Sequence, residues 1–161
     1  MSAPNFFNAP AYGSVIPYDA KLVGVQRYRE KMEYNHPTYG KQELALVWND
    51  SSSALAVNTA CSWEAANSMK AAVAAASDKR GTVAGLVPVA IPDDYIGWIV
   101  TKGITLAVSN AAITDGAQIG TLGGAGKVDD DAALTDSELF GRALVAATGA
   151  DETITVELFG A

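Results

Sequence analysis

The chain has 161 residues, the length of one ordinary domain, and 49% of them are apolar, so the composition predicts a packed core. A net charge of −7 argues against nucleic-acid binding through a general basic surface, and no apolar run is long enough for a membrane helix. The chain has one cysteine, Cys61, and one histidine, His36. These are too few for a disulfide within the chain, and they argue against a cysteine-based zinc site and against the usual histidine acid–base chemistry. We therefore expect no enzyme, no cofactor, and neither a nucleic-acid nor a membrane partner.

The first forty residues differ from the rest in charge and in side-chain type. Residues 1–41 carry five basic and three acidic side chains, whereas the other 120 residues carry six basic and fifteen acidic ones. The first 39 residues hold seven of the thirteen aromatic residues and four of the six prolines. Because proline interrupts regular structure, we expect an extended arm and connecting segment over residues 1–40, followed by a β-rich domain over residues 41–161.

The aromatic side chains of this arm need cover, because a free disordered tail is normally poor in aromatics. Either the chain's own body or a neighbouring polypeptide supplies that cover, and the functional hypothesis is an arm that reaches across a subunit boundary. Basic side chains of the segment would pair with carboxylates of the partner and set the register of binding. The predicted partner-binding residues are Phe6, Phe7, Tyr12, Tyr18, Arg27, Tyr28, Arg29 and Lys31.

The beginning of the domain predicts a hairpin and then a helix. Residues 41–49 and 54–59 are strand candidates, joined by a polar five-residue turn. Residues 62–80 are rich in alanine, start with a capping serine and end in basic residues before Gly81, a pattern that favours the one short helix of the fold.

From Gly81 onward the pattern is that of short strands separated by turns. Tyr95–Lys102 is the strongest strand signal, and Thr153–Phe159 alternates cleanly between apolar and polar residues. Many short strands at intervals of about ten residues indicate a small β-barrel or tulip-like body, or a sandwich. The other predicted strands are residues 82–91, 104–108, 117–122 and 139–147.

The candidate chemical sites are weak. The glycine-rich run 120–127 has the wrong spacing for a phosphate loop, and Val128 replaces its magnesium-binding hydroxyl. The run Asp129–Asp131 lacks the alternating ligands of an EF-hand, so we interpret it as a solvated acidic turn, with a calcium site of another type as the alternative. His36 is expected to pack in a loop or interface, and Cys61 to be buried. Core packing also accounts best for the three tryptophans.

The C-terminal half resembles a known family. The strand and turn Gly97–Gly103 (GWIVTKG) is similar to the aromatic-x-x-x-x-Gly unit of small tailed-phage capsid decoration (cement) proteins, and residues 83–90 resemble the strand that precedes it. Residues 115–120 resemble a recurrent loop and strand of that family, and residues 141–147 with 151–159 resemble its closing pair. The resemblance covers about residues 81–161 and leaves the arm unmatched.

The resemblance implies a structural virion protein, made in the host cytoplasm, that sits on the outer surface of a phage capsid. Such a protein clamps adjacent subunits of the major capsid protein, and sister copies of the chain are a further expected partner, as a dimer or a trimer. The sequence is compatible with this function, because a clamp needs no chemistry, only many weak contacts repeated over a symmetric shell. The alternative hypotheses are a virion head-fibre protein and a β module that binds glycans or the host surface.

Overall fold

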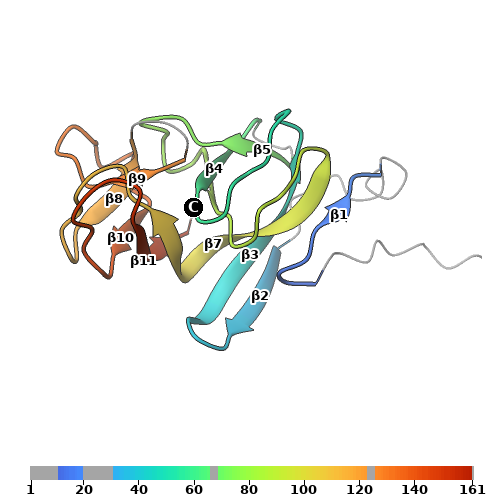
Figure 1. Ribbon diagram of the computed structural model, residues 1–161, viewed down its shortest axis with the longest axis horizontal. Coiled ribbons are helices and arrows are strands. Elements are labelled where there is room, and N and C mark those ends of the chain that lie inside the picture. The colour runs from blue at the N-terminus through green and yellow to red at the C-terminus, as the bar shows by residue number, and fades with distance from the viewer. Residues whose placement is uncertain (1–10, 20–30, 66–68, 123–125, 161) are drawn as a thin grey trace, which may run out of the picture.

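The computed structural model describes residues 11–19, 31–65, 69–122 and 126–160 (Figure 1). Within these ranges the chain is mainly β, as predicted, and eleven strands form one mixed sheet. The strands are β1 (Ile16–Pro17), β2 (Lys31–His36), β3 (Gly40–Asn49), β4 (Ala60–Trp63), β5 (Lys70–Val73), β6 (Val83–Leu86), β7 (Tyr95–Val108), β8 (Gln118–Thr121), β9 (Val128–Asp129), β10 (Gly141–Ala143) and β11 (Thr153–Phe159).

Strand β7 is the long strand that connects the two ends of the molecule (Figure 1). Its first half pairs antiparallel with β3, and its second half pairs antiparallel with β11. The sequence predicted two strands on either side of Gly103, but the chain runs through this glycine without a break. Gly103 adopts a φ of +100°, and a Cβ at this position would lie 2.6 Å from the Lys41 carbonyl oxygen. A bare backbone is therefore what lets β7 pass so close to β3.

The strands before β7 do not make a clear barrel. Their pairings run β3–β5–β4–β6–β7, and β7 also pairs with β3; β3–β5 is parallel and the other pairs are antiparallel. This ring is not a clear barrel, because a single register pair, Leu86 with Val100, joins β6 to β7. The predicted hairpin of residues 41–49 with 54–59 is wrong, because β3 pairs with the preceding strand β2, and Leu55 makes only an isolated bridge to Ile91.

The short helix predicted over residues 62–80 is not present in the described part of this segment, which forms β4, β5 and turns. Alanine has a high intrinsic helix propensity, but tertiary pairing overrides propensity where small side chains let strands approach. Ala71 is buried without exposure, and β5 lies between β3 and β4. The Asp78 carboxylate closes the following turn by accepting from the Ala75 amide at 2.9 Å and from the Ser62 hydroxyl at 2.6 Å.

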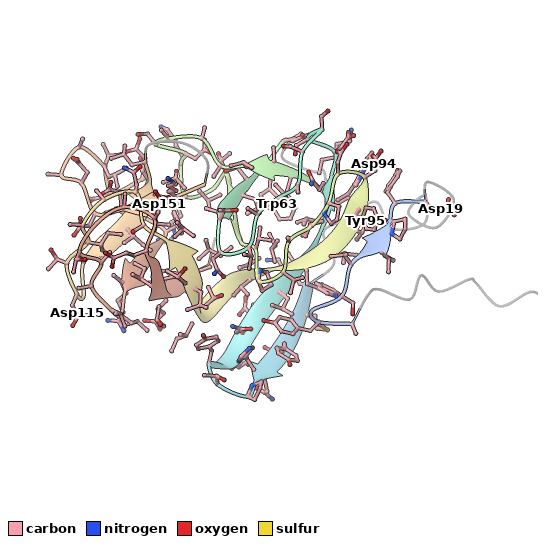
Figure 2. The ribbon with its side chains drawn as sticks, in the orientation of Figure 1. Asp19, Trp63, Asp94, Tyr95, Asp115 and Asp151 are labelled. Carbon is pink, nitrogen blue, oxygen red and sulfur yellow. The ribbon has the colours of Figure 1, made fainter. Side chains whose placement is uncertain are left out.

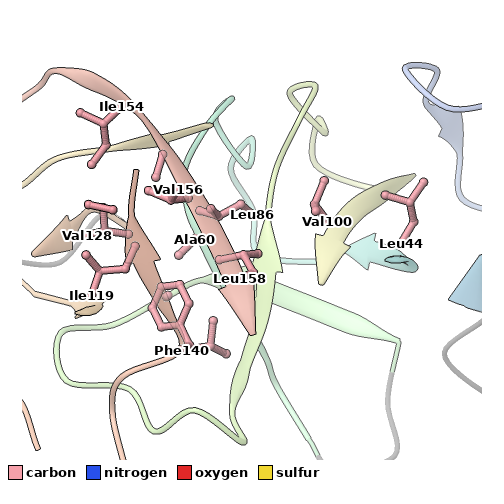
Figure 3. Packing of buried hydrophobic residues seen from close by; sticks show 14 of the residues in the cluster. Leu44, Ala60, Leu86, Val100, Ile119, Val128, Phe140, Ile154, Val156 and Leu158 are labelled. Carbon is pink, nitrogen blue, oxygen red and sulfur yellow. The ribbon is translucent and has the colours of Figure 1, made fainter. Parts of the chain in front are cut away.

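Alternation along β3 and β7 divides the interior into two cores. Leu44 and Leu46 face the larger core, whereas Ala45 and Val47 face a smaller one, so β3 is covered on both sides. Figure 3 shows the larger core, in which side chains of β11 meet those of β8, β9 and the segment before β10. Its residues shown in that view include Ile119, Val128, Phe140, Ile154, Val156 and Leu158.

The strands after β7 form the other end of the sheet, in the order β7–β11–β10–β8–β9. The prediction for residues 153–159 is confirmed with the same bounds, and its predicted apolar face of Ile154, Val156 and Leu158 is the buried one. The predicted strands at 82–91, 117–122 and 139–147 are each shorter in the structure, because turns occupy the remaining residues of each run.

Candidate functional site

The described part of the N-terminal arm lies against the chain's own body. Ile16 and Pro17 pair antiparallel with Ile96 and Tyr95 at the start of β7. The Tyr18 amide extends this contact by donating to the Asp94 carbonyl oxygen at 2.7 Å. Of the two sources of cover considered for the arm, the chain's own body thus provides it for residues 11–19.

Tyr12 belongs to a cluster of aromatic rings, here called the aromatic cluster, formed by Tyr12, Tyr34, His36 and Tyr39. The rings of Tyr12 and Tyr34 stack with centroids 4.2 Å apart, and those of His36 and Tyr39 stack at 4.6 Å. The edge of His36 faces both tyrosines of the first stack. All four side chains are only partly buried, so the cluster is an aromatic surface at the β2–β3 hairpin.

The hairpin turn fixes the ring of His36. Its Nδ1 accepts hydrogen bonds from the backbone amides of Thr38 at 3.1 Å and Tyr39 at 3.2 Å. Because Nδ1 accepts both bonds, the His36 ring is tied to the backbone of this turn. His36 therefore organises the turn that holds Tyr39, which accounts for it better than an acid–base role.

Burial of Tyr12 changes the acidity of its phenol group. Burial raises the pKa of the Tyr12 phenol, and the nearby phenols of Tyr34 and Tyr39 raise it further. The ring therefore stays a neutral hydrogen-bond donor over the whole physiological pH range. Tyr12 therefore contributes apolar ring surface and an uncharged phenol to the aromatic cluster.

A second stack lies at the other end of β3 and is here called the tryptophan stack. The Tyr18 ring lies parallel to the Trp48 ring at 3.7 Å, with an interplanar angle of 5°. The Lys70 ammonium lies 4.5 Å from the centre of the Trp48 ring and forms an ion pair with Asp50. Among the described residues, the Trp48 indole N–H is buried without a hydrogen-bond partner. Trp48 thus anchors the arm by ring contact alone.

Of the residues predicted to bind a partner, Tyr12, Tyr18 and Lys31 lie in the described ranges. Tyr12 belongs to the aromatic cluster, Tyr18 belongs to the tryptophan stack, and Lys31 is exposed at the start of β2. Their binding to another polypeptide stays a prediction. Phe6, Phe7, Arg27, Tyr28 and Arg29 lie outside the described residues.

Tyr34, His36 and Tyr39 were not among the residues predicted to bind a partner. The signal was available in the segment Lys31–His36, where Met32, Tyr34 and His36 alternate with polar residues. This period of two predicts a strand that has one apolar face. The segment had instead been assigned to the arm and its connecting residues.

The carboxylates of the aspartate run serve the local structure. Asp129 is 4% exposed, and its two oxygens accept from the Asn110 side-chain amide and from the Asp130 backbone amide, both at 2.8 Å. Asp130 in turn accepts from the Thr114 amide. Within the described ranges, no three side chains of His, Cys, Asp or Glu come together in a way that would hold a metal ion.

The remaining candidates offer little chemistry. Burial raises the pKa of the Cys61 thiol to about 12, so at neutral pH it is a protonated side chain of the smaller core. A hollow of about 280 Å³ between β3, β7 and β11 is lined by charged groups. Those charges are already paired, Lys41 with Glu33, Lys102 with Glu43 and Glu157 with Arg142. The described residues also contain no helix of membrane-crossing length and hydrophobicity.

Figure 2 labels residues at the two ends of the molecule. Tyr95 and Asp94 lie beside β1, near the tryptophan stack, whereas Asp115 and Asp151 lie at the opposite end, around β8–β11. Among the described residues, most of the partly exposed aromatic rings lie at β1–β3 and the turn between β2 and β3, whereas β8–β11 carry one, Phe159.

The comparisons with known proteins give a likeness of fold. No protein-family model matches the chain, and no curated protein matches its sequence. Among solved structures, the chain is similar to the head fibre gp8.5 N base of bacteriophage phi29, with a TM-score of 0.56 and 11% sequence identity. The match covers 71% of this chain and 92% of that chain. At this identity the two proteins share a fold, and function does not follow from fold alone.

Proposed function

We propose that this chain is a structural protein of a phage virion that attaches to the outside of the head. The observation that carries the proposal is the similarity of its fold to the phi29 head fibre base, nearly all of which is matched. The resemblance of residues 81–161 to phage decoration proteins rests on sequence motifs and supports the same class. Both likenesses are to phage head proteins.

In this proposal the partner is the major capsid protein, and the chain acts as a clamp between adjacent subunits. Such a clamp needs a stiff body and a contact surface, and repetition over a symmetric shell adds up weak contacts. The doubly covered strands β3 and β7 supply the stiff body, because their residues pack into two cores. A head-fibre base is the second form of the same function, in which the body attaches to the shell and carries a further structure outward.

The aromatic cluster is the contact surface that the described residues offer. Partly buried tyrosines are enriched at protein interfaces because one end of the ring is apolar and the other is polar. Tyr12, Tyr34 and Tyr39 present such rings on one face of β2, and the charges of Lys31 and Glu33 are exposed on the other face. Burying these rings against a capsid subunit would stabilise each contact by a few kcal/mol, on the order of about 25 cal/mol per Å² of apolar surface.

Cosedimentation with purified empty heads of the phage that encodes the chain tests the proposal. We expect the full chain to sediment with heads in a saturable way. The double variant Tyr12→Ala, Tyr39→Ala should weaken this binding at least about tenfold, because hot-spot tyrosines contribute more than about 1.4 kcal/mol. Val145→Ala is the matched control, because Val145 is an apolar residue that is 50% exposed at the acidic end.

Two results would contradict the proposal. If the full chain does not sediment with heads at any concentration, it is not a head protein. If it sediments and the tyrosine variant binds as well as the Val145→Ala control, the contact surface lies elsewhere on the chain. Saturable binding to glycans or host cells without binding to heads would favour the alternative of a host-binding module.

A further inference from the structure

Among the described strands that end the sheet or lie outside its order, β2 has the longest unpaired edge. The sheet order begins at β2 and ends at β9, and β1 pairs with β7 outside this order. Strands β1 and β9 have two residues each, whereas β2 has six. Short edge strands expose few backbone groups, but a six-residue edge offers a template for another strand. In the part of the chain that the structure describes, no strand pairs with this edge.

The hydrogen bonds of β3 show which backbone groups of β2 point outward. The Trp48 amide donates to the Met69 carbonyl oxygen next to β5, on the edge of β3 opposite β7. Since β2 lies on that same edge, Gln42 and Leu44 direct their backbone groups toward β2, and their partners Tyr34 and Met32 direct theirs back. The N–H and C=O groups of the alternate residues Lys31, Glu33 and Asn35 therefore point away from the sheet.

The side chains of β2 give the strand one apolar and one polar face, which an additional strand would have to match. Met32, Tyr34 and His36 are partly buried on the face of the aromatic cluster, and Lys31, Glu33 and Asn35 are exposed on the other. An added strand would extend the aromatic face on one side and meet charged and amide groups on the other. The strand that fits must therefore alternate apolar and polar residues in the same way.

We propose that this strand is β2 of a second copy, paired antiparallel about a twofold axis at Tyr34. A twofold axis perpendicular to the sheet keeps each face on its own side, so only residues of the same face come opposite each other. The register centred on Tyr34 places Tyr34 against its own copy and Met32 against His36. It also places Glu33 against Asn35, whose outward backbone groups then exchange both hydrogen bonds.

Charge selects this register over its neighbour. Centring the pair on Glu33 would place two carboxylates directly opposite, which is destabilising in a sheet. Centring it on Tyr34 places each Glu33 carboxylate opposite an Asn35 amide, which is a hydrogen-bond donor. Of these two registers, the one centred on Tyr34 makes the edge complementary to itself, and the resulting contact closes as a dimer.

The mass of the full chain in solution, measured by light scattering over a concentration series, tests this proposal. We expect about twice the chain mass of 16.7 kDa. Asn35→Pro removes an outward N–H while leaving the bonds between β2 and β3 in place, so this variant should have the mass of one chain. Asn35→Ala is the matched control, because it removes the same side chain and keeps the N–H, and it should remain largely dimeric.

A charge exchange tests the register and keeps the test decisive if the proline variant does not fold. Asn35→Glu creates two opposed carboxylate pairs per dimer and should raise the dissociation constant by about tenfold, and adding Glu33→Lys should restore it. A wild-type chain that stays monomeric, or a larger assembly unaffected by Asn35→Pro, would overturn the proposal. A monomer whose head binding is lost in Asn35→Pro would assign the edge to the capsid protein and overturn it equally.

Discussion

The two ends of β7 belong to regions that are stabilised in different ways. Around its first half, β1, β2 and β3 are covered by the aromatic cluster and the tryptophan stack, whose rings remain partly exposed. Around its second half, β8–β11 bury aliphatic side chains such as Ile119 and Val156 without exposure. From Ile104 onward the sequence has only two aromatic residues, and nine acidic side chains against two basic ones.

This difference separates a buried aliphatic body from a partly exposed aromatic surface within one sheet. Fully buried aliphatic packing contributes stability and offers nothing to a partner. Partly exposed stacked rings contribute less stability per residue but keep apolar surface available for binding. In the proposed function, the N-terminal region would hold the contact surface, and the C-terminal region would be the scaffold that carries it.

The largest effect is expected where the two regions meet. Gly103→Val places a side chain where a Cβ would lie 2.6 Å from the Lys41 carbonyl oxygen, at a φ of +100° that valine does not adopt. Overpacking and backbone strain together should lower the free energy of unfolding by about 4 kcal/mol. Urea denaturation measures this loss. Gly116→Ala is the control, because its φ is +79° but nothing lies within 4 Å, so it should cost only about 1 kcal/mol. Equal losses for the two variants would show that β7 and β3 do not approach so closely.

A somewhat smaller effect is expected in the aliphatic core. Ile119→Ala removes a side chain with no exposed surface and leaves a cavity among its neighbours, which should cost about 3 kcal/mol. Chemical denaturation followed by circular dichroism measures this loss in the free energy of unfolding. Val145→Ala, at a half-exposed position of the same region, should change stability by less than about 0.5 kcal/mol. An Ile119→Ala chain as stable as the Val145→Ala chain would be inconsistent with the packing in Figure 3.

The stacks of the N-terminal region should matter less for stability. Tyr18→Ala removes the ring that lies 3.7 Å from Trp48 and should lower the unfolding free energy by about 1 kcal/mol. It should also shift the tryptophan emission to the red, because the Trp48 ring becomes exposed to water. Tyr18→Phe keeps the ring and should leave both the stability and the spectrum near those of the wild type. A spectrum that is the same in all three proteins would mean that residues 11–19 do not rest on β3.

The smallest effects should appear in the pH dependence of stability, and they differ in sign between the regions. The Tyr12 pKa is raised in the folded state, so the unfolded chain loses this proton first and stability falls as pH rises above about 10. Tyr12→Phe should reduce that loss. Hydrogen bonds from Thr148 lower the Glu152 pKa, so stability falls as pH drops below about 4 through the lowered folded value. Glu152→Gln should reduce this second loss. Thermal midpoints measured across pH give both losses of stability. If the two variants leave the loss at high pH and the loss at low pH unchanged, these assignments are wrong.

The C-terminal region was the easier one to predict from the sequence. The clean alternation of residues 153–159 specifies both the strand and its buried face, because one face of the strand lies on a core. Local signals fail where pairing decides the structure. Residues 62–80 look helical by propensity, yet Ala71 and its neighbours are buried between strands that come from distant parts of the chain.

The candidate surface was predictable only in part. The concentration of aromatic residues near the N-terminus correctly indicated where rings gather, but it gave no information about which ring stacks on which. Tyr12 meets Tyr34, and Tyr18 meets Trp48, through contacts that depend on the order of β1, β7, β3 and β2 in the sheet. Such long-range order is set by the whole core and is not encoded in any local pattern.

Strand β7 also determines how the molecule bears mechanical load. β1 is attached to β7 at Tyr95 and Ile96, and β11 is attached along Lys102–Val108. Tension applied between β1 and β11 therefore travels along this one strand, whose middle is bonded to β3 as well. Stability of the β7 ladders therefore decides how firmly β1 and β11 are held to each other.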